Sequence, residues 1–165
     1  MADFRPQEIL KVLDRHDVRY VLMGGIAAVL HGASNVTTDV DVVPEIGKQN
    51  LERLTQALRE LDARIRVTGE PEGVPFDYSP ESLARVEMWN LTTKFGDLNI
   101  AFTPSGTRGY EDLRKDVVVM RIDGTDVAVA SLADVIRSKE AAGRPRDRAA
   151  LPALRELLSR QQSHN

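Results

Sequence analysis

The 165-residue sequence contains no cysteine. This absence excludes a disulfide framework, a thiolate zinc site and a catalytic cysteine, and it agrees with a reducing compartment. The sequence also lacks an apolar run long enough for a signal peptide at its start or for a membrane span anywhere. We therefore expect a cytoplasmic protein with no membrane partner.

The sequence also lacks an excess of positive charge, because its formal net charge is −3. A broadly basic surface for nucleic acid is therefore not expected, since affinity for phosphate backbones comes mainly from clustered Lys and Arg. Any RNA contact would have to be local. The basic cluster that qualifies consists of Arg137, Lys139, Arg144, Arg146 and Arg148.

The composition, with 42% apolar and 28% charged residues, is that of one globular domain, which we place at 1–165 with its core at about 18–158. Short β-branched or aromatic runs alternate with helical patterns, so we expect an α/β fold with a mixed sheet flanked by helices. The helices are expected at 6–16, 26–31, 48–61, 131–142 and from about 147. The strands are expected at 19–23, 38–43, 86–93, 97–102, 117–122 and 126–130, and a surface loop is expected at 69–80.

Two acidic residues alternate with valines in the second expected strand, Thr38-Asp-Val-Asp-Val-Val43. A strand places Asp39 and Asp41 on one face and the valines on the other. Two carboxylates held close together repel each other unless a cation lies between them, and Mg²⁺ is commonly held by one or two carboxylates together with substrate phosphates. The pair therefore predicts a hard-cation site, although a solvated strand face shows the same alternation.

Gly24 and Gly25 stand where the first expected strand ends and a helix begins. Bare backbone N–H groups at such a turn can meet a phosphate without obstruction by side chains, although an ordinary tight turn also favours glycine. The glycines and the acids together favour a nucleotide site over two unrelated structural features. The sequence has neither a GxGxxG pattern, a P-loop lysine nor an EF-hand loop. A sugar-nucleotide glycosyltransferase would be expected to have a longer chain.

One segment of the sequence reads Leu22-Met-Gly24-Gly25, then thirteen residues, then Asp39-Val-Asp41-Val. This segment resembles the signature of the polymerase-β-like nucleotidyltransferase superfamily. Within it, three later segments are similar to the AbiEii-type nucleotidyltransferase toxins and their small relatives. These segments are Phe95-Gly-Asp-Leu-Asn-Ile, Pro104-Ser-Gly-Thr-Arg-Gly-Tyr-Glu-Asp-Leu113 and Ser138-Lys-Glu-Ala-Ala-Gly-Arg-Pro-Arg-Asp147. The resemblance implies the nucleotidyltransferase fold and Mg²⁺- or Mn²⁺-dependent transfer of a nucleoside monophosphate from an NTP to an acceptor hydroxyl.

The resemblance also implies roles for individual residues. Asp39 and Asp41 would bind the metal and the triphosphate, Gly24 and Gly25 would open the phosphate-binding turn, and Lys139 and Asp147 match the family's later Lys and Asp positions. We expect Lys139 to neutralise triphosphate oxygens, with Arg144 and Arg146 as helpers and Asp147 fixing one of these cations. A solvated Lys139 and a helix-end clamp of Arg and Asp are the structural alternatives.

The third acidic position departs from the family pattern, because Asn99 stands where the family has an acid. Asp97 shares a strand face with Asn99 and is the alternative third metal ligand and catalytic carboxylate. If neither residue serves, the site would bind nucleotide but react slowly.

By the same resemblance, the acceptor would be the 3′ end of a tRNA or another RNA, and a cognate antitoxin would be a partner. Two alternatives stay open. One is a nucleotidyltransferase that modifies a protein or a small molecule, and the other is a nucleotide-binding module with a decayed active site.

Overall fold

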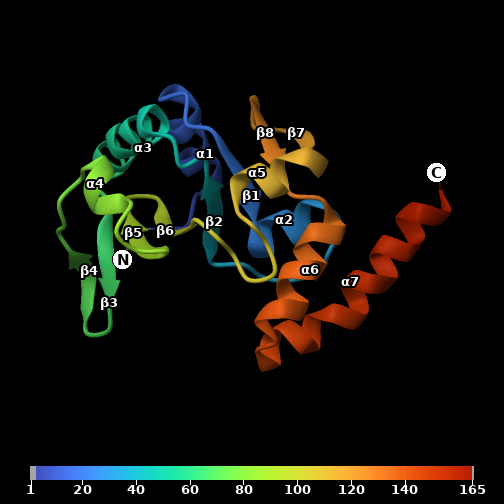
Figure 1. Ribbon diagram of the computed structural model, residues 1–165. Helices are drawn as coiled ribbons and strands as arrows, with labels where there is room; N and C mark the ends of the chain where they lie inside the picture. Colours follow the sequence, from blue (N-terminus) through green and yellow to red (C-terminus); the bar gives the residue numbers. More distant parts are fainter. Residues whose placement is uncertain (1–2, 165) are drawn as a thin grey trace.

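The computed structural model describes residues 3–164 of the chain (Figure 1). The helices are α1 (Pro6–Arg15), α2 (Gly24–Leu30), α3 (Lys48–Glu60), α4 (Pro80–Leu83), α5 (Tyr110–Leu113), α6 (Leu132–Ala142) and α7 (Pro145–Ser163). The strands are β1 (Tyr20–Met23), β2 (Asp39–Pro44), β3 (Arg64–Val67), β4 (Glu70–Val74), β5 (Met88–Thr93), β6 (Gly96–Ala101), β7 (Val118–Ile122) and β8 (Thr125–Val129). A short 3₁₀ helix spans Arg114–Asp116.

The strands form one sheet in the order β4-β3-β5-β6-β2-β1-β8-β7. The pairs β2–β6 and β1–β8 are parallel and the other neighbours are antiparallel. The predicted α/β fold with a mixed sheet flanked by helices is therefore confirmed. The parallel pairing of β2 with β6 is what brings two segments of polar side chains, far apart in the sequence, to the middle of the sheet.

The helices cover the sheet through the apolar stripes that their sequences show. The leucines of α3 at 51, 54 and 58 are buried, as are Ile9, Leu10, Val12 and Leu13 of α1. In Figure 1, α1 and α3 lie next to each other, whereas α2, α6 and α7 gather to the right of β2, with α7 running outward to the C-terminal end. In residues 3–164, no helix has both the length and the apolar composition required to cross a membrane.

Local signals located several element ends correctly. Ser131 caps α6, because its hydroxyl accepts a hydrogen bond from the Asp134 N–H, and Gly143 ends the helix in the left-handed conformation with φ of 62°. The second C-terminal helix begins at Pro145, two residues before the predicted start, because proline is well suited to the first turn of a helix.

The prediction of a surface loop at 69–80 is wrong for the first half of this segment. Residues Glu70–Val74 form β4, which pairs with β3 in an antiparallel hairpin. Gly69, with φ of 88°, forms the turn between them, and Gly73 has φ of 75°. The prolines and glycines that suggested a loop instead mark a tight turn and an irregular edge strand, where the missing N–H of a proline is tolerated.

Candidate active site

A cleft of about 720 Å³ lies where β2 and β6 meet α2, α6 and the start of α7. Every site residue predicted from the sequence except Asp97 lines it. These residues are Gly24, Gly25, Asp39, Asp41, Asn99, Lys139, Arg144, Arg146 and Asp147. The fold therefore brings the acidic strand and the basic helix ends to one site, although about a hundred residues separate them in the sequence.

Asp39 and Asp41 project from β2 on the side away from the core. Val40 and Val42 between and after them are almost completely buried, at 0% and 1% exposure. The strand is held on one side by β1 and on the other by β6, so the two carboxylates stand on a backbone that is paired along both edges. Neighbouring strands on both sides fix the separation of the carboxylates.

Gly24, the first residue of α2, allows the Asp41 carboxylate to lie against the start of this helix. Its φ is +66°, and a Cβ atom added there would stand 2.2 Å from Asp41 Oδ2. At Gly25 an added Cβ would stand 2.9 Å from Thr37 Oγ1. Both glycines are therefore required by close approach, and Gly24 also by its backbone conformation.

The environment of Asp41 disfavours its charge. Burial, followed by the nearby Asp39 carboxylate, raises the pKa of Asp41 to about 6, against the lowering effects of a hydrogen bond from Asn99 and of the Lys139 charge. The Asp39 carboxylate is thus close enough to oppose the ionisation of Asp41.

Asn99 lies opposite Asp41 on β6 and bridges the carboxylate pair. Its side-chain Nδ2 donates to Asp39 Oδ2 at 3.2 Å and to Asp41 Oδ1 at 3.1 Å. Its Oδ1 accepts a hydrogen bond of 2.8 Å from Arg66 of β3. The amide therefore acts on the carboxylates as a donor.

Asp97 does not complete a cluster of three acids. It lies opposite Asp39 in the pairing of β2 with β6, but its carboxylate is bound to Arg66, with Nη1 to Oδ2 at 3.1 Å. Across the part of the chain that the structure describes, no group of three or more His, Asp or Glu side chains is placed to hold a metal ion. In this structure Asp97 is paired with Arg66 rather than with Asp39 and Asp41, and the metal set of Asp39, Asp41 and Asp97 stays a prediction.

Lys139 and Arg144 converge on a single buried acid. Asp147 is 1% exposed; its Oδ1 lies 3.8 Å from Lys139 Nζ, and its Oδ2 accepts from Arg144 Nε at 2.7 Å. Burial favours the neutral acid, but the hydrogen bonds from Arg144 and the charges of Arg144 and Lys139 outweigh it, so the pKa of Asp147 is lowered. Asp147 is therefore an anion that fixes two cations at the edge of the cleft.

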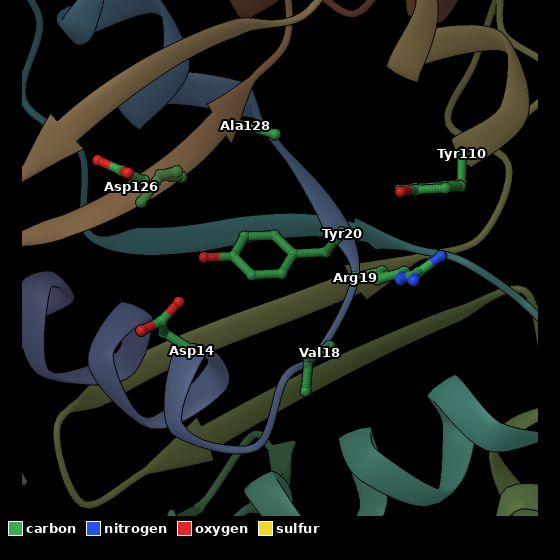
Figure 2. A pocket seen from close by; sticks show the side chains of 8 residues that line it. Asp14, Val18, Arg19, Tyr20, Tyr110, Asp126 and Ala128 are labelled. Carbon is green, nitrogen blue, oxygen red and sulfur yellow. The ribbon is translucent and has the colours of Figure 1, made fainter.

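A second, smaller pocket of about 220 Å³ lies at the start of β1. Figure 2 shows the Tyr20 ring at its centre, with Asp14 and Asp126 on one side and Tyr110 on the other. Burial, and then the charge of Asp14, raises the pKa of the Tyr20 phenol. No site residue predicted from the sequence lines this pocket, so it is not the candidate active site.

The sequence model of a nucleotidyltransferase family of unknown function, DUF6036, matches residues 6–159. The chain belongs to this family. It is therefore a nucleotidyltransferase, and the superfamily expected from the sequence is confirmed, whereas the AbiEii subtype stays a prediction. No curated protein matches this nucleotidyltransferase in a sequence search.

Three solved structures share its fold. The lincomycin-bound crystal structure of the lincosamide antibiotic adenylyltransferase LnuA has a TM-score of 0.62 and 15% identity, covering 95% of this chain and 99% of LnuA. A putative nucleotidyltransferase from Thermotoga maritima has a TM-score of 0.57 and 16% identity, over 96% and 97% of the two chains. The solution structure of the antibiotic-resistance factor ANT(2'')-Ia has a TM-score of 0.53 and 14% identity, over 96% and 94%.

Arg66 is a charged residue of this site that was not predicted from the sequence. It lies on β3, a strand that was not predicted, and only the pairing of β3 with β5 and of β5 with β6 carries it to the carboxylates. The alternation Arg64-Ile-Arg-Val67 is a weak strand signal, and it gives no indication of which acid the arginine meets.

Proposed function

We propose that this nucleotidyltransferase moves a nucleoside monophosphate from an NTP to an acceptor hydroxyl, with a divalent cation held by Asp39 and Asp41. The observation that carries the proposal is the arrangement of the cleft, in which this carboxylate pair shares one cavity with Lys139, Arg144 and Arg146. Carboxylates for a cation and cations for a triphosphate are the two requirements of nucleotidyl transfer.

The donor set fits Mg²⁺ or Mn²⁺. Asp39 and Asp41 supply hard oxygen ligands, and the raised pKa of Asp41 reflects burial together with a neighbouring negative charge that a cation would neutralise. Such a cation supplies charge neutralisation at the phosphate oxygens and alignment of the triphosphate. Two protein carboxylates are a common number for Mg²⁺ sites that also use substrate phosphates.

The remaining residues position the nucleotide. Lys139, Arg144 and Arg146 bind the β- and γ-phosphates, while Asp147 keeps Lys139 and Arg144 at the cleft edge. The acceptor oxygen forms a bond to the α-phosphorus, the bond from that phosphorus to the bridging oxygen breaks, and pyrophosphate leaves with the electron pair. The acceptor proton passes to water, since the Asn99 amide is not a base, and we therefore expect a slow enzyme.

The acceptor we favour is a small hydroxyl compound. From residues 62–101, which lie across β2 from α6 and α7 (Figure 1), the cleft is lined by Arg66, Met88, Asn90, Asn99 and Ala101. The charged residue among these, Arg66, is already paired with Asp97. This side of the cleft therefore has little positive charge to bind the phosphate backbone of an RNA. LnuA, which shares the fold, was solved with the small molecule lincomycin.

A tRNA acceptor in a toxin–antitoxin pair remains the alternative. The cluster of Arg144, Arg146 and Arg148 supports it, because these cations lie together at the start of α7. Incubation of the protein with each α-labelled NTP and Mg²⁺, and separately with RNA, protein and small-molecule fractions of a cell extract, separates the two. Label in the small-molecule fraction supports our choice and label in tRNA supports the alternative. Label in no fraction, or equal labelling by Asp39→Asn and Asp41→Asn, contradicts the proposed function.

Lys139→Ala should weaken NTP binding by about 1.5 to 3 kcal/mol, the range for a hydrogen bond to a charged group, or roughly ten- to a hundredfold in Kd. Asp147 keeps its partner Arg144, so the fold should survive. Isothermal titration with Mg²⁺-NTP measures the change. Lys139→Arg should recover only part of the affinity because the planar guanidinium differs in shape and reach.

The controls for Lys139 are a ligand and a second lysine. A nucleoside without phosphates should bind equally well to wild type and Lys139→Ala. Lys115→Ala, on an exposed surface outside the cleft, should bind NTP normally. Unchanged NTP affinity in Lys139→Ala would show that Lys139 pairs with Asp147 and does not contact the triphosphate. Arg144 or Arg146 would then be the phosphate ligands.

Asn99→Asp should raise the transfer rate at least about tenfold, because it adds a carboxylate that can accept the acceptor's proton beside Asp39 and Asp41. Asp97→Ala should change the rate far less, since Arg66 already occupies the Asp97 carboxylate. Single-turnover rates at saturating NTP measure both. A steep loss in Asp97→Ala with no gain in Asn99→Asp would instead make Asp97 the catalytic acid of β6.

A further inference from the structure

Arg66 reaches across the sheet from β3 to β6. Its Nη1 donates to the Leu91 carbonyl of β5 at 3.2 Å and lies 3.1 Å from Asp97 Oδ2. Its Nη2 donates to Asn99 Oδ1 at 2.8 Å. The guanidinium is planar and presents several donors in a fixed fork, so three acceptors on two strands determine its position.

This position dictates which way the Asn99 amide faces. A carboxamide has an acceptor end and a donor end, whereas a guanidinium only donates and a carboxylate only accepts. With Oδ1 toward Arg66, Nδ2 faces Asp39 and Asp41 at 3.2 and 3.1 Å. The reverse orientation would place donor against donor and acceptor against acceptor. Arg66 and the carboxylate pair therefore select the same orientation from opposite sides.

We propose that Arg66 is a positioning residue that keeps the Asn99 amide turned as a donor toward Asp39 and Asp41 while no cation is bound. The amide N–H groups then compensate part of the carboxylate repulsion, and they compete with a cation for the same oxygens. Without Arg66 the amide is free to turn Oδ1 toward the carboxylate pair, where it becomes a third oxygen ligand for a divalent cation. Arg66 thus restrains the binding of free cation; this consequence rests on the proposed function, but the orientation of the amide does not.

The orientation is tested by the side-chain NH₂ signals of Asn99 in ¹⁵N-labelled, metal-free protein, assigned by their loss in Asn99→Asp. We expect the wild-type signals to be protected from exchange with water. In Arg66→Ala they should lose protection and move toward the positions of exposed asparagines. Arg66→Lys should resemble Arg66→Ala, because a single ammonium cannot bridge Asp97 and Asn99. Arg64→Ala, which removes the same charge two residues earlier on β3, should leave the signals unchanged.

The consequence for cations is tested by titrating Mn²⁺ into nucleotide-free protein and following free Mn²⁺ by electron paramagnetic resonance. Arg66→Ala should bind Mn²⁺ about three- to tenfold more tightly than wild type, the range for one hydrogen bond exchanged for another. Arg64→Ala should bind as wild type does. In an Asn99→Ala background the Arg66→Ala substitution should have little further effect, since Arg66 acts through Asn99.

The proposal would be overturned by Asn99 signals that are the same in wild type and Arg66→Ala, or by effects of Arg66→Ala and Asn99→Ala on Mn²⁺ affinity that simply add. Wild-type affinity in Arg66→Lys would show that the charge alone matters and would also overturn it. A failure of the proposed function is recognised separately. In that case the wild type would bind no Mn²⁺-NTP, while the Asn99 signals would still report what Arg66 does.

Discussion

Asp41→Asn should abolish nucleotidyl transfer and at the same time make the metal-free protein more stable at neutral pH. The loss of transfer follows from the proposed cation site, because a neutral amide cannot replace one of only two carboxylates that hold the cation's charge. We expect the rate to fall at least about a thousandfold, a loss comparable to that from removing one strong electrostatic contact to a transition state. Asp39→Asn should have a similar effect on transfer.

The gain in stability follows from the pKa of Asp41. Its value in the folded protein is raised from 3.8 to about 6, so the folded state binds this proton more tightly than the unfolded state. Stability is then highest below the unfolded value and is lost as pH rises through about 6. At neutral pH the ionised Asp41 costs about 2 to 3 kcal/mol of folding free energy, since each pKa unit corresponds to about 1.4 kcal/mol. Asp41→Asn removes this cost.

Urea unfolding in the presence of a chelator measures the effect. The difference in unfolding free energy between Asp41→Asn and wild type should be small at about pH 4 and should grow to its full size by about pH 7.5. Asp126→Asn, on an exposed part of β8, is the control and should show no such growth. A difference in unfolding free energy that does not change with pH would mean that repulsion between the two carboxylates does not destabilise the folded protein. Transfer at the wild-type rate in Asp41→Asn would mean that Asp41 does not hold the cation.

The core of the site could be predicted from sequence because its signals are local. The strand, the Gly24-Gly25 turn and the second strand follow one another within about 25 residues, and the alternation of Asp39 and Asp41 with valines requires only the two-residue period of a strand. The capping of α6 by Ser131 and its end at Gly143 are also local. In these cases the chemistry of a few neighbouring residues determines the backbone.

The contacts that distinguish this site are not local, and for that reason the sequence did not indicate them. Asp97 and Asn99 share a strand face, but only the position of β3 across β5 decides that Arg66 binds both and withdraws Asp97 from the carboxylate pair. The β3–β4 hairpin was itself missed, because its prolines and glycines are typical of a loop. Strand order depends on the whole sheet, and no short segment encodes it.

Gly24→Ala should lower both stability and transfer much more than an alanine at a comparable turn. The φ of +66° costs an L-residue about 1 to 2 kcal/mol by itself. The added Cβ would also stand 2.2 Å from Asp41 Oδ2, so the carboxylate or the turn must move, which adds about 1 to 3 kcal/mol. A displacement of about 1 Å at a catalytic group lowers rates by roughly a hundredfold, and we expect at least this loss of transfer.

Gly124→Ala separates the two causes. Gly124 has φ of +83° and no heavy atom within 4 Å of an added Cβ, so alanine there meets only the backbone cost. We expect a loss of about 1 to 2 kcal/mol in urea unfolding and unchanged transfer. In an Asp41→Ala background the carboxylate oxygen is gone, so the stability cost of Gly24→Ala should fall toward that of Gly124→Ala. If Gly24→Ala costs the same with and without the Asp41 carboxylate and transfer survives, then the turn does not hold that carboxylate in place, and Gly24 is needed only for its backbone conformation.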